Sequence, residues 1–381
     1  MDEKRNALLT IGIICAIILA FTVADMIEPD RTFSETENRI LAGKPQFSWD
    51  ELFYGDYTTD YEEYVTDQFV SRDKWIGIKT RTDIALQKKE INGVYLAEDN
   101  YLIEKHDPAE YTTELEEQKL EYLKKLVERW DAKVMLVPTA DNILTDKLPA
   151  YATYYNEEEF LQRVKGEIGE EHYIDVFAAL KEHAQEDIYY RTDHHWTSLG
   201  AYYGFLAWAD AVERFPYPYS VNGMITVTDQ FEGTLHSKIN IAGAKDRIQY
   251  FPETELRPVK VTYDFAAEKD TLYEEKYLDT KNQYGFFLDD NHGLIEIDTD
   301  YKNGKTLFVI KDSYANSMIP LLTTHYEKIY VVDLRYFNMR LFDFMEQCEP
   351  KASIEQDMPE EGMDVLVLYN CIHFLKDFRY F

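Results

Sequence analysis

A long apolar segment lies near the N-terminus and differs from everything that follows it. Residues 7–24 carry no charged side chain and come shortly after Lys4 and Arg5. At a rise of about 1.5 Å per residue, a helix of this length nearly crosses the hydrocarbon core of a bilayer. The basic residues before the segment and Asp25 and Glu28 after it place the N-terminus in the cytoplasm. We therefore expect a single-pass anchor in the cell membrane with the C-terminal domain extracellular; a cleaved signal peptide is the alternative.

The pattern then changes from polar to helical. Residues 29–48 are polar, contain Pro29 and Pro45 and have no sustained period, which is typical of a stalk. Residues 49–86 place aromatic and aliphatic side chains at helical spacings and predict two helices. We therefore divide the chain into a cytoplasmic tip and transmembrane anchor (1–28), a stalk with a helical lead-in (29–85) and a larger domain (86–381).

In the larger domain, short β-type runs alternate with amphipathic helical segments. Strands rich in β-branched residues are predicted at 133–137, 306–310, 328–332 and 364–369, with shorter extended runs at 174–176 and 187–190. Helices are predicted at 114–130, 177–182 and 198–214, the last with Ser198 as N-cap, and a hairpin with an Asp-Asn turn at 93–103. This alternation is typical of an α/β fold with a parallel sheet flanked by helices.

Residues 215–300 depart from this alternation. They contain four prolines and short β-type runs at 223–229, 257–264 and 293–299. We expect a β-rich insertion at about residues 215–300 that lies outside the main sheet.

Composition narrows the class of protein. A hydrophobic share of 45% with 29% charged residues is typical of a globular chain. The formal net charge of -31, with no stripe of Lys and Arg, argues against nucleic-acid binding. Cys15, Cys348 and Cys371 form no C-x-x-C pair, and both a Cys348–Cys371 bridge and two separate thiols fit this spacing.

The run YYRTDHHWTSL, residues 189–199, holds the most concentrated chemistry. It brings together a carboxylate, two imidazoles, an indole and hydroxyl groups just before a predicted helix. Asp193, His194 and His195 can form an acid–base pair, a metal-ligand cluster or a buried polar group. Because adjacent histidines on a loop rarely both reach one ion and further ligands would be needed, we expect no metal.

A serine follows the predicted strand 306–310. Loops after parallel strands meet at one edge of a sheet, and Ser313 would have backbone N–H groups of a helix start beside it for a developing oxyanion. With Asp193 as orienting group and His195 as base, Ser313 completes the set that nucleophilic catalysis needs. The alternative is that Ser313 caps the following helix.

These motifs resemble those of the DHHW protein family, a relative of the alginate O-acetyltransferase group in the SGNH hydrolase-like superfamily. The resemblance rests on TDHHWT at 192–197 and KDSYANS at 311–317. It extends to ENRILAGKP (37–45), DQFVSR (67–72), GTLHSK (233–238) and DLRYF (333–337). It implies an SGNH-like, flavodoxin-like sheet in permuted order, because the Asp-His pair precedes the serine here.

The resemblance also implies roles for single residues. Asp193, His195 and Ser313 match the triad positions, and no cofactor is implied. Strand counting from Ser313 makes Asn370 the candidate oxyanion donor. Further candidates for the substrate-binding wall are Arg335, His236 and Tyr314, of which Arg335 and His236 fit a structural hydrogen-bonding role equally well. His194 and Trp196 are assigned to packing, and Lys311 stands where the superfamily usually has glycine, which questions the turn before Asp312.

The function implied is transfer of an acyl group, in particular acetyl, to or from hydroxyls of an extracellular or cell-wall polysaccharide. Ser313 would carry the acyl group, and water as the acceptor would make the same site an esterase. The resemblance implies a membrane-bound O-acyltransferase as partner. The alternative is a catalytically inactive polysaccharide-binding or assembly protein of the same fold.

Overall fold

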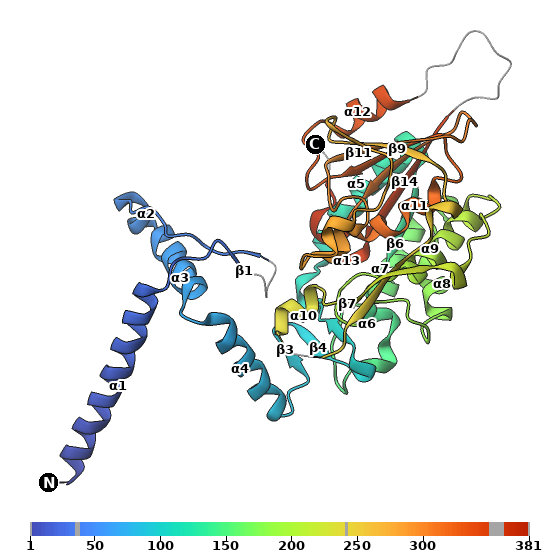
Figure 1. Cartoon of the computed structure of the whole chain (residues 1–381). Helices are drawn as coiled ribbons and strands as arrows, with labels where there is room; N and C mark the ends of the chain where they lie inside the picture. The colour runs from blue at the N-terminus through green and yellow to red at the C-terminus, as the bar shows by residue number, and fades with distance from the viewer. Residues whose placement is uncertain (1, 35–38, 241–242, 350–361, 380–381) are drawn as a thin grey trace. The chain divides into compact units, whose positions relative to one another are not determined.

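The computed structural model describes residues 2–34, 39–240, 243–349 and 362–379, which fall into two compact units (Figure 1). The first unit comprises Met1–Lys88 and Ser237–Ala242, and the second comprises Lys89–His236 and Gly243–Phe381. Glu37 and Asn38, the first two residues of the ENRILAGKP motif, lie outside the described residues.

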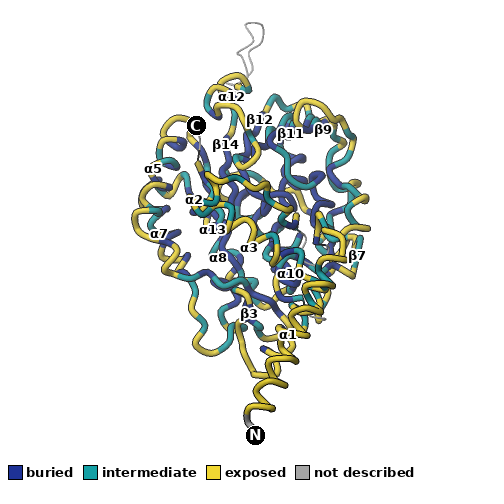
Figure 2. The backbone as a smooth tube through the Cα atoms, turned by 90° about the vertical axis from the view of Figure 1, so that its left-hand side faces the viewer, coloured by how far each residue is buried: buried dark blue, intermediate teal, exposed yellow. Residues whose placement is uncertain are grey.

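The first unit is mainly helical. Its elements are α1 (Asp2–Ile27), β1 (Phe33–Ser34), β2 (Arg39–Ile40), α2 (Trp49–Tyr54), α3 (Asp56–Gln68) and α4 (Arg72–Ala85). Within α1, Lys4–Ile27 is long and apolar enough to cross a membrane, with a mean hydropathy of 2.7, and Figure 2 shows it exposed along most of its length. Three helices replace the two expected after residue 48, because Gly55 has a φ of 93° and ends α2 where α3 begins.

Two of the motif segments contact each other in this unit. Arg39 of ENRILAGKP pairs with Asp67 of DQFVSR through both guanidinium nitrogens, and the backbone N–H of Ala42 donates to Asp67 Oδ2 at 2.9 Å. The hydrogen bonds from Arg39 lower the pKa of the Asp67 carboxyl against the opposing effect of its burial. The two segments therefore form one structural joint.

A seven-stranded mixed sheet forms the centre of the second unit (Figure 1). The strand order is β10 (Ala267–Lys269), β9 (Val259–Tyr263), β11 (Leu294–Thr299), β13 (Lys328–Asp333), β12 (Thr306–Lys311), β14 (Met363–Asn370) and β6 (Lys133–Val137). From β13 to β6 neighbouring strands are parallel, whereas β10, β9 and β11 are antiparallel. The four main predicted strands are confirmed.

The expectation that the insertion lies outside this sheet is wrong for part of it. β9 and β11 belong to the 215–300 segment, yet β11 pairs with β13 from Leu294↔Val332 to Asp298↔Lys328. Ile295 and Ile297 thereby continue the buried surface of the parallel strands. A short alternating run shows that a strand forms but not which edge it joins. β7 (Ile225–Phe231) and β8 (Asp246–Tyr250) pair apart from the main sheet, as does the single bridge Tyr273↔Phe287.

Both faces of the sheet are covered by helices, because its central strands bury side chains on both sides. Val134, Phe308 and Val367 pack with α5 (Thr113–Trp130), α7 (Glu157–Ile168), α12 (Leu341–Cys348) and α13 (Cys371–Asp377). Their alternates Met135, Val309 and Leu366 pack with α6 (Ala140–Ile143), α8 (Val176–Glu182), α9 (Ser198–Ala211) and α11 (Ile319–Leu322). The unit is a helix–sheet–helix sandwich that fixes the carboxyl ends of β6, β12 and β14 in place.

Smaller elements complete the frame. β3 (Glu90–Ile91), β4 (Val94–Leu96) and β5 (Leu102–Glu104) form a sheet that confirms the predicted hairpin, with Asp99 and Asn100 at positive φ in its turn. The run 187–190 makes only one bridge, Tyr189↔Trp196, instead of a strand. The N-cap of α9 is Thr197 and not Ser198, since Thr197 Oγ1 accepts from the Gly200 N–H at 3.3 Å. All three cysteines are free thiols.

Candidate active site

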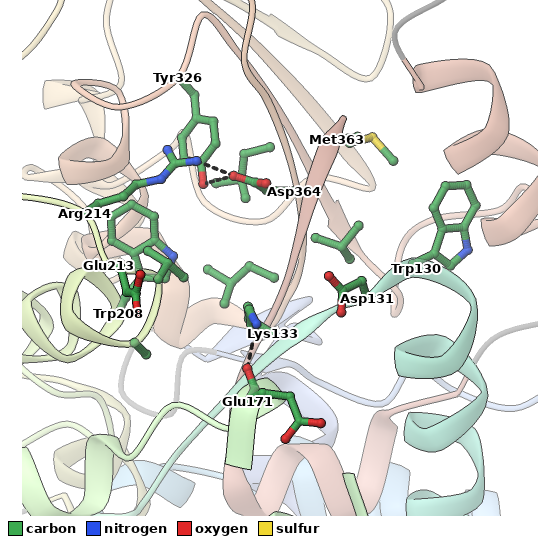
Figure 3. A pocket seen from close by; sticks show the side chains of 15 residues that line it. Trp130, Asp131, Lys133, Glu171, Trp208, Glu213, Arg214, Tyr326, Met363 and Asp364 are labelled. Atoms are coloured by element: carbon green, nitrogen blue, oxygen red, sulfur yellow. Dashed lines mark hydrogen bonds and ion pairs between the residues drawn. The ribbon is translucent and has the colours of Figure 1, made fainter. Parts of the chain in front are cut away.

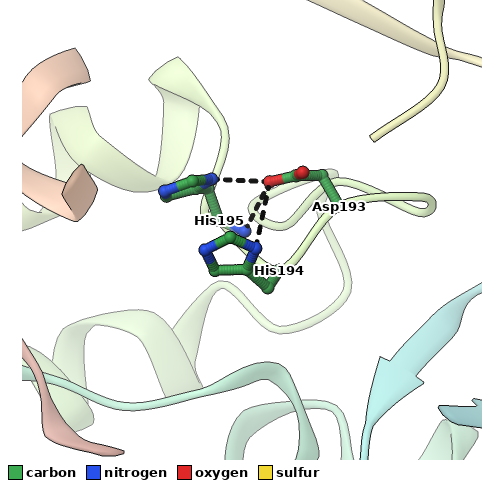
Figure 4. A group of neighbouring side chains, drawn as sticks. All are labelled: Asp193, His194 and His195. Carbon is green, nitrogen blue, oxygen red and sulfur yellow. Dashed lines mark hydrogen bonds and ion pairs between the residues drawn. The ribbon is translucent and has the colours of Figure 1, made fainter. Parts of the chain in front are cut away.

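Asp193, His195 and Ser313 form one hydrogen-bonded row. His195 Nδ1 lies 2.6 Å from Asp193 Oδ1, the contact visible in Figure 4, and His195 Nε2 lies 2.8 Å from Ser313 Oγ. The structure thus brings together three side chains of which the last is 118 positions from the second. With the carboxylate on one ring nitrogen and the hydroxyl on the other, the imidazole can accept the serine proton.

Ser313 stands directly after the sheet. β12 ends at Lys311, and a 3-10 turn covers Ser313–Ser317. Asp312, not Ser313, is the N-cap of this turn, because its Oδ1 accepts from the Tyr314 N–H at 3.0 Å. The other oxygen of Asp312 lies 2.7 Å from His373 Nδ1 and accepts from the Asn370 N–H at 3.1 Å, so the serine turn is tied to the end of β14. The Ser313 hydroxyl is thus left to His195.

The start of α10 (Thr234–Ile239) fixes the Asp193 carboxylate. Asp193 Oδ2 accepts from the Thr234 N–H at 2.8 Å and from its hydroxyl at 3.1 Å. Burial favours the neutral acid, but His195 and these hydrogen bonds outweigh it and lower the pKa of Asp193 below its ordinary value. The carboxylate is therefore ionised and can orient His195.

Two aromatic rings hold the His195 imidazole in its plane. Tyr284 stacks on it with ring centroids 3.9 Å apart and an angle of 10°, and the Tyr284 hydroxyl donates to the Ser313 carbonyl at 3.1 Å. The Tyr314 ring contacts it at a tilt of 48° with centroids 5.1 Å apart, and the Tyr314 backbone carbonyl accepts a hydrogen bond from Trp196 Nε1 at 2.8 Å. Sequence reasoning missed Tyr284, because one tyrosine among 30 in the chain carries no signal of its own.

His194 points to a different partner. Its Nδ1 lies 2.7 Å from Thr234 Oγ1, and the Tyr314 hydroxyl donates to its carbonyl. Burial and the neighbouring His195 lower the pKa of His194 to about 3, against the opposing effect of Asp193, so the ring is neutral. Asp193, His194 and His195 are close enough to hold a metal ion, but Asp193 Oδ1, His194 Nδ1 and both ring nitrogens of His195 already make the contacts above.

A comparison with known families identifies the family of this chain. The family model described as DHHW protein matches residues 134–332, just over half of the 381 residues. The chain belongs to the DHHW family. The matched range includes the candidate triad but ends before Asn370. No curated protein matches the chain.

Solved structures show likenesses of fold. A DHHW family protein from Eubacterium siraeum is 23% identical, with a TM-score of 0.58 over 75% of this chain and 93% of that chain. Bacillus cereus PatB1, solved with a sulfonyl adduct, is 19% identical, with a TM-score of 0.57 over 75% of this chain and 98% of that chain. The O-acetyltransferase domain of Pseudomonas putida AlgJ, at 14% identity over 74% of this chain and 92% of that chain, has a TM-score of 0.42, too low to bear on the fold.

In this DHHW family chain Lys311, the residue just before Asp312, has a structural role. Lys311 is fully buried, and its Nζ lies 2.8 Å from Asn316 Oδ1 and 3.5 Å from Asp333 Oδ2. Burial lowers the pKa of Lys311, and Asp333 opposes this effect. Arg335 is held by the same carboxylate, at 2.9 Å from Nε and 2.6 Å from Nη2.

Of the remaining sequence candidates, the structure places Tyr314 and Asn370 beside the triad but not His236 or Arg335. Tyr314 and Asn370 line a small cavity beside Asp193. Asn370 Oδ1 caps α13 by accepting two backbone N–H groups, while its Nδ2 donates to the Val137 carbonyl at 3.1 Å. His236 lies beside Glu232 and Lys281 instead. Among the described residues, neither Arg335 nor His236 makes a hydrogen bond or ion pair with the candidate triad.

A second polar cluster, which sequence reasoning missed, borders the same cavity. His106 Nδ1 lies 2.9 Å from Asp141 Oδ2, and the Thr139 hydroxyl lies 2.5 Å from Asp141 Oδ1 and 2.7 Å from Glu157 Oε1. A hydroxyl gives one hydrogen, so one of the two carboxyls must be protonated. Burial and the nearby Asp141 raise the pKa of Glu157 to about 8, which makes Glu157 the protonated one. His106, Asp141 and Glu157 could hold a metal by position, but this shared proton gives them a hydrogen-bonded chain instead.

A wider cavity lies at the opposite end of the parallel strands. Its volume is about 500 Å³, and its lining includes Lys133 and Met363, the residues at which β6 and β14 begin (Figure 3). Asp364 there accepts hydrogen bonds from Arg214 and Tyr326. The candidate triad lies at the other end of these strands, where they finish, and does not line this cavity.

Gly233→Ala should displace Asp193, because the new Cβ would lie 2.3 Å from Asp193 Cβ and 2.4 Å from its Oδ2. We expect the free energy of unfolding, measured by urea titration, to fall by about 1–3 kcal/mol, the usual cost of overpacking. Gly243→Ala is the matched control, because no described heavy atom lies within 4 Å of its new Cβ. Equal stability of the two variants would contradict the close approach.

Glu157→Gln should change how stability depends on pH. The native carboxyl has a pKa of about 8, against about 4.3 in an unfolded chain, so between these values the native state binds more protons. The wild-type free energy of unfolding therefore falls, by up to roughly 1.4 kcal/mol per pH unit, as the pH rises through this window. The glutamine variant lacks this loss.

Urea titrations of both proteins across the window measure the difference. Glu158→Gln serves as control, since Glu158 is exposed in the same helical turn. A Glu157→Gln curve that runs parallel to that of the wild type would rule out the protonated carboxyl.

Proposed function

We propose that the chain is an extracytoplasmic acyltransferase or esterase that acts on polysaccharide hydroxyl groups through an acyl-enzyme on Ser313. The observation that carries the proposal is the row Asp193–His195–Ser313, with contacts of 2.6 and 2.8 Å. The domain would then be an SGNH-like fold in permuted order. The acyl group favoured by the DHHW resemblance is acetyl.

The reaction would proceed in two balanced steps. His195 Nε2 takes the Ser313 proton while Oγ attacks the acyl carbonyl, and the leaving group of the donor departs with that proton. An acceptor hydroxyl then loses its proton to His195 and attacks the acyl-serine, which releases the new ester and restores Ser313 Oγ–H. We assign Asn370 as the oxyanion donor through the second hydrogen of its Nδ2, because its amide lines the cavity beside the triad.

The non-catalytic alternative loses its main support. It gained weight from Lys311 in place of glycine. However, the Lys311 ammonium contacts Asp333 and Asn316, and Asp312 still caps the turn that follows. Burying an ionised carboxylate is costly. A binding protein would gain nothing from a buried carboxylate that contacts an imidazole whose other nitrogen contacts a serine. The geometry therefore favours the enzyme.

The apolar helix α1 suits an anchor at the cell membrane with the catalytic domain outside. In that position the domain would meet cell-wall or extracellular polysaccharide. A membrane-bound O-acyltransferase that delivers acyl groups outward remains the partner we propose.

Trapping with a sulfonyl fluoride tests the nucleophile, a choice prompted by the sulfonyl adduct of PatB1. We expect mass spectrometry of the full chain to find one sulfonyl group on Ser313, because His195 activates that hydroxyl. Ser313→Ala should abolish both the label and the release of 4-nitrophenol from 4-nitrophenyl acetate. Ser220→Ala, at an exposed serine, is the control. A label that survives in Ser313→Ala would refute the proposal.

Asp193→Asn tests the orienting carboxylate. The amide can keep the hydrogen bonds from Thr234 but cannot accept from His195 Nδ1 without losing one of them, so the imidazole would present the wrong tautomer. We expect the rate of 4-nitrophenyl acetate cleavage to fall by about 10⁴-fold while the fold, followed by circular dichroism, stays intact. A loss of less than tenfold would mean that Asp193 has only a structural role.

A further inference from the structure

We infer that α4 and the adjoining end of α1 form a docking face for phospholipids of the membrane that α1 crosses. The inference goes beyond the proposed chemistry but rests on the proposed anchor. An apolar groove between the two helices carries it, together with a face of α4 on which exposed apolar and basic side chains lie side by side.

The groove lies between α1 and α4 within the first unit and has a volume of about 330 Å³. Ala20, Phe21 and Ala24 of α1 form one side of it, and Trp75 and Ile78 of α4 form apolar parts of the other. Ligand sites in proteins usually measure about 300–1,000 Å³. The groove is therefore large enough to take part of a lipid acyl chain.

The groove lies at the depth where the apolar part of α1 ends. Ala24 is the last residue of the uncharged run 7–24. Phe21 lies roughly 5 Å from Ala24 along the helix axis, at about 1.5 Å per residue. The Phe21 ring contacts the rings of Phe69 and Trp75, each with centroids 5.8 Å apart. These aromatic side chains thus belong at the edge of the hydrocarbon core, where tryptophan is enriched.

The exposed surface of α1 continues into the groove. Asp25 Oδ1 accepts a hydrogen bond from the Val70 N–H at 3.1 Å and ties α1 to the residue pair before α4. Among residues 4–27, Phe21, Ala24 and Asp25 are partly buried and the others are exposed. Since lipid would surround the exposed residues of a spanning α1, the apolar groove beside them opens to lipid and not to water.

One face of α4 combines basic and apolar side chains. Lys74, Trp75, Ile78 and Arg81, the α4 face, recur at spacings of three, four and seven residues, which place them on one side of a helix. All four are exposed, Trp75 by 44% and Ile78 by 51%. In the part of the chain that the structure describes, the Lys74 and Arg81 side chains form no ion pair or hydrogen bond. Both cations are therefore available to a phosphate group.

Charge distinguishes α4 from the helix before it. α4 carries four basic and two acidic side chains, although the formal net charge of the chain is -31. α3 carries five acidic side chains and no basic one. An anionic lipid surface therefore attracts α4 and repels α3. Exposed tryptophan and aliphatic side chains beside basic ones are typical of a helix that lies between lipid headgroups and acyl chains.

Quenching of tryptophan fluorescence in nanodiscs tests the docking. The full-length protein is placed in discs of phosphatidylcholine and phosphatidylglycerol, with or without bromine on the acyl chains, because bromine quenches a tryptophan that it contacts. We expect brominated lipid to lower the wild-type fluorescence and Trp75→Phe to remove at least half of this loss. Trp49→Phe, at a residue of α2 that is 65% exposed, is the matched control and should keep the loss. Quenching unchanged in Trp75→Phe would overturn the inference, whether water or another protein covers the α4 face.

The two basic side chains supply the second arm. Lys74→Gln combined with Arg81→Gln should lower the quenching of Trp75 about twofold or more in discs that contain phosphatidylglycerol, because the attraction of two cations to the headgroups is lost. Lys124→Gln combined with Lys125→Gln is the matched control, since these lysines of α5 pair with glutamates instead.

Equal quenching in the Lys74 and Arg81 double variant and in the wild type would overturn the contact of the α4 face with lipid headgroups. A protein that does not enter the discs would refute the anchor on which the inference rests. The sulfonyl label on Ser313 tests the proposed chemistry separately, so the failures remain distinct.

Discussion

The buried carboxylate of Asp193 is the constraint on which the rest of the site depends. An ionised carboxyl out of contact with water must be compensated on all sides. Here one oxygen meets the backbone and ring of His195, and the other meets the backbone and hydroxyl of Thr234. Asp193 occupies the space that a Cβ at position 233 would need, so glycine fits there. Thr234 of the GTLHSK motif therefore completes the hydrogen bonding of Asp193 in the DHHW motif, from a separate stretch of the chain.

The sheet positions the serine of the site. β12 and β14 are neighbours, so their carboxyl ends bring the Ser313 turn and Asn370 together. Asp312 fixes this junction with three contacts, to Tyr314, Asn370 and His373. The buried Lys311 joins the same strand to β13 through Asp333. The serine thus stands on rigid strands, while the imidazole reaches it from a loop that Asp193 and two aromatic rings hold still.

The sequence predicts the parts of this site that have a local signature, and misses those that depend on tertiary contacts. β-branched runs predict β6, β12, β13 and β14, and Asp193, His195 and Ser313 stand out by their residue types and places after strands or before helices. Tyr284 does not, because its stacking on His195 depends on the path of the insertion. Glu157 is one of many acids, and only burial distinguishes it. The pairing of β11 with β13 follows from a shared buried face, which a strand pattern alone does not specify.

The carboxyls around the site are compensated in different ways. Asp333 faces the cations Lys311 and Arg335, whereas Asp193 and Asp312 have imidazoles and N–H groups. Within the described residues no cation forms an ion pair with Glu157, which keeps a proton instead because burial and Asp141 raise its pKa to about 8. Burial of these acids is therefore compensated by cations, by hydrogen-bond donors or by a retained proton.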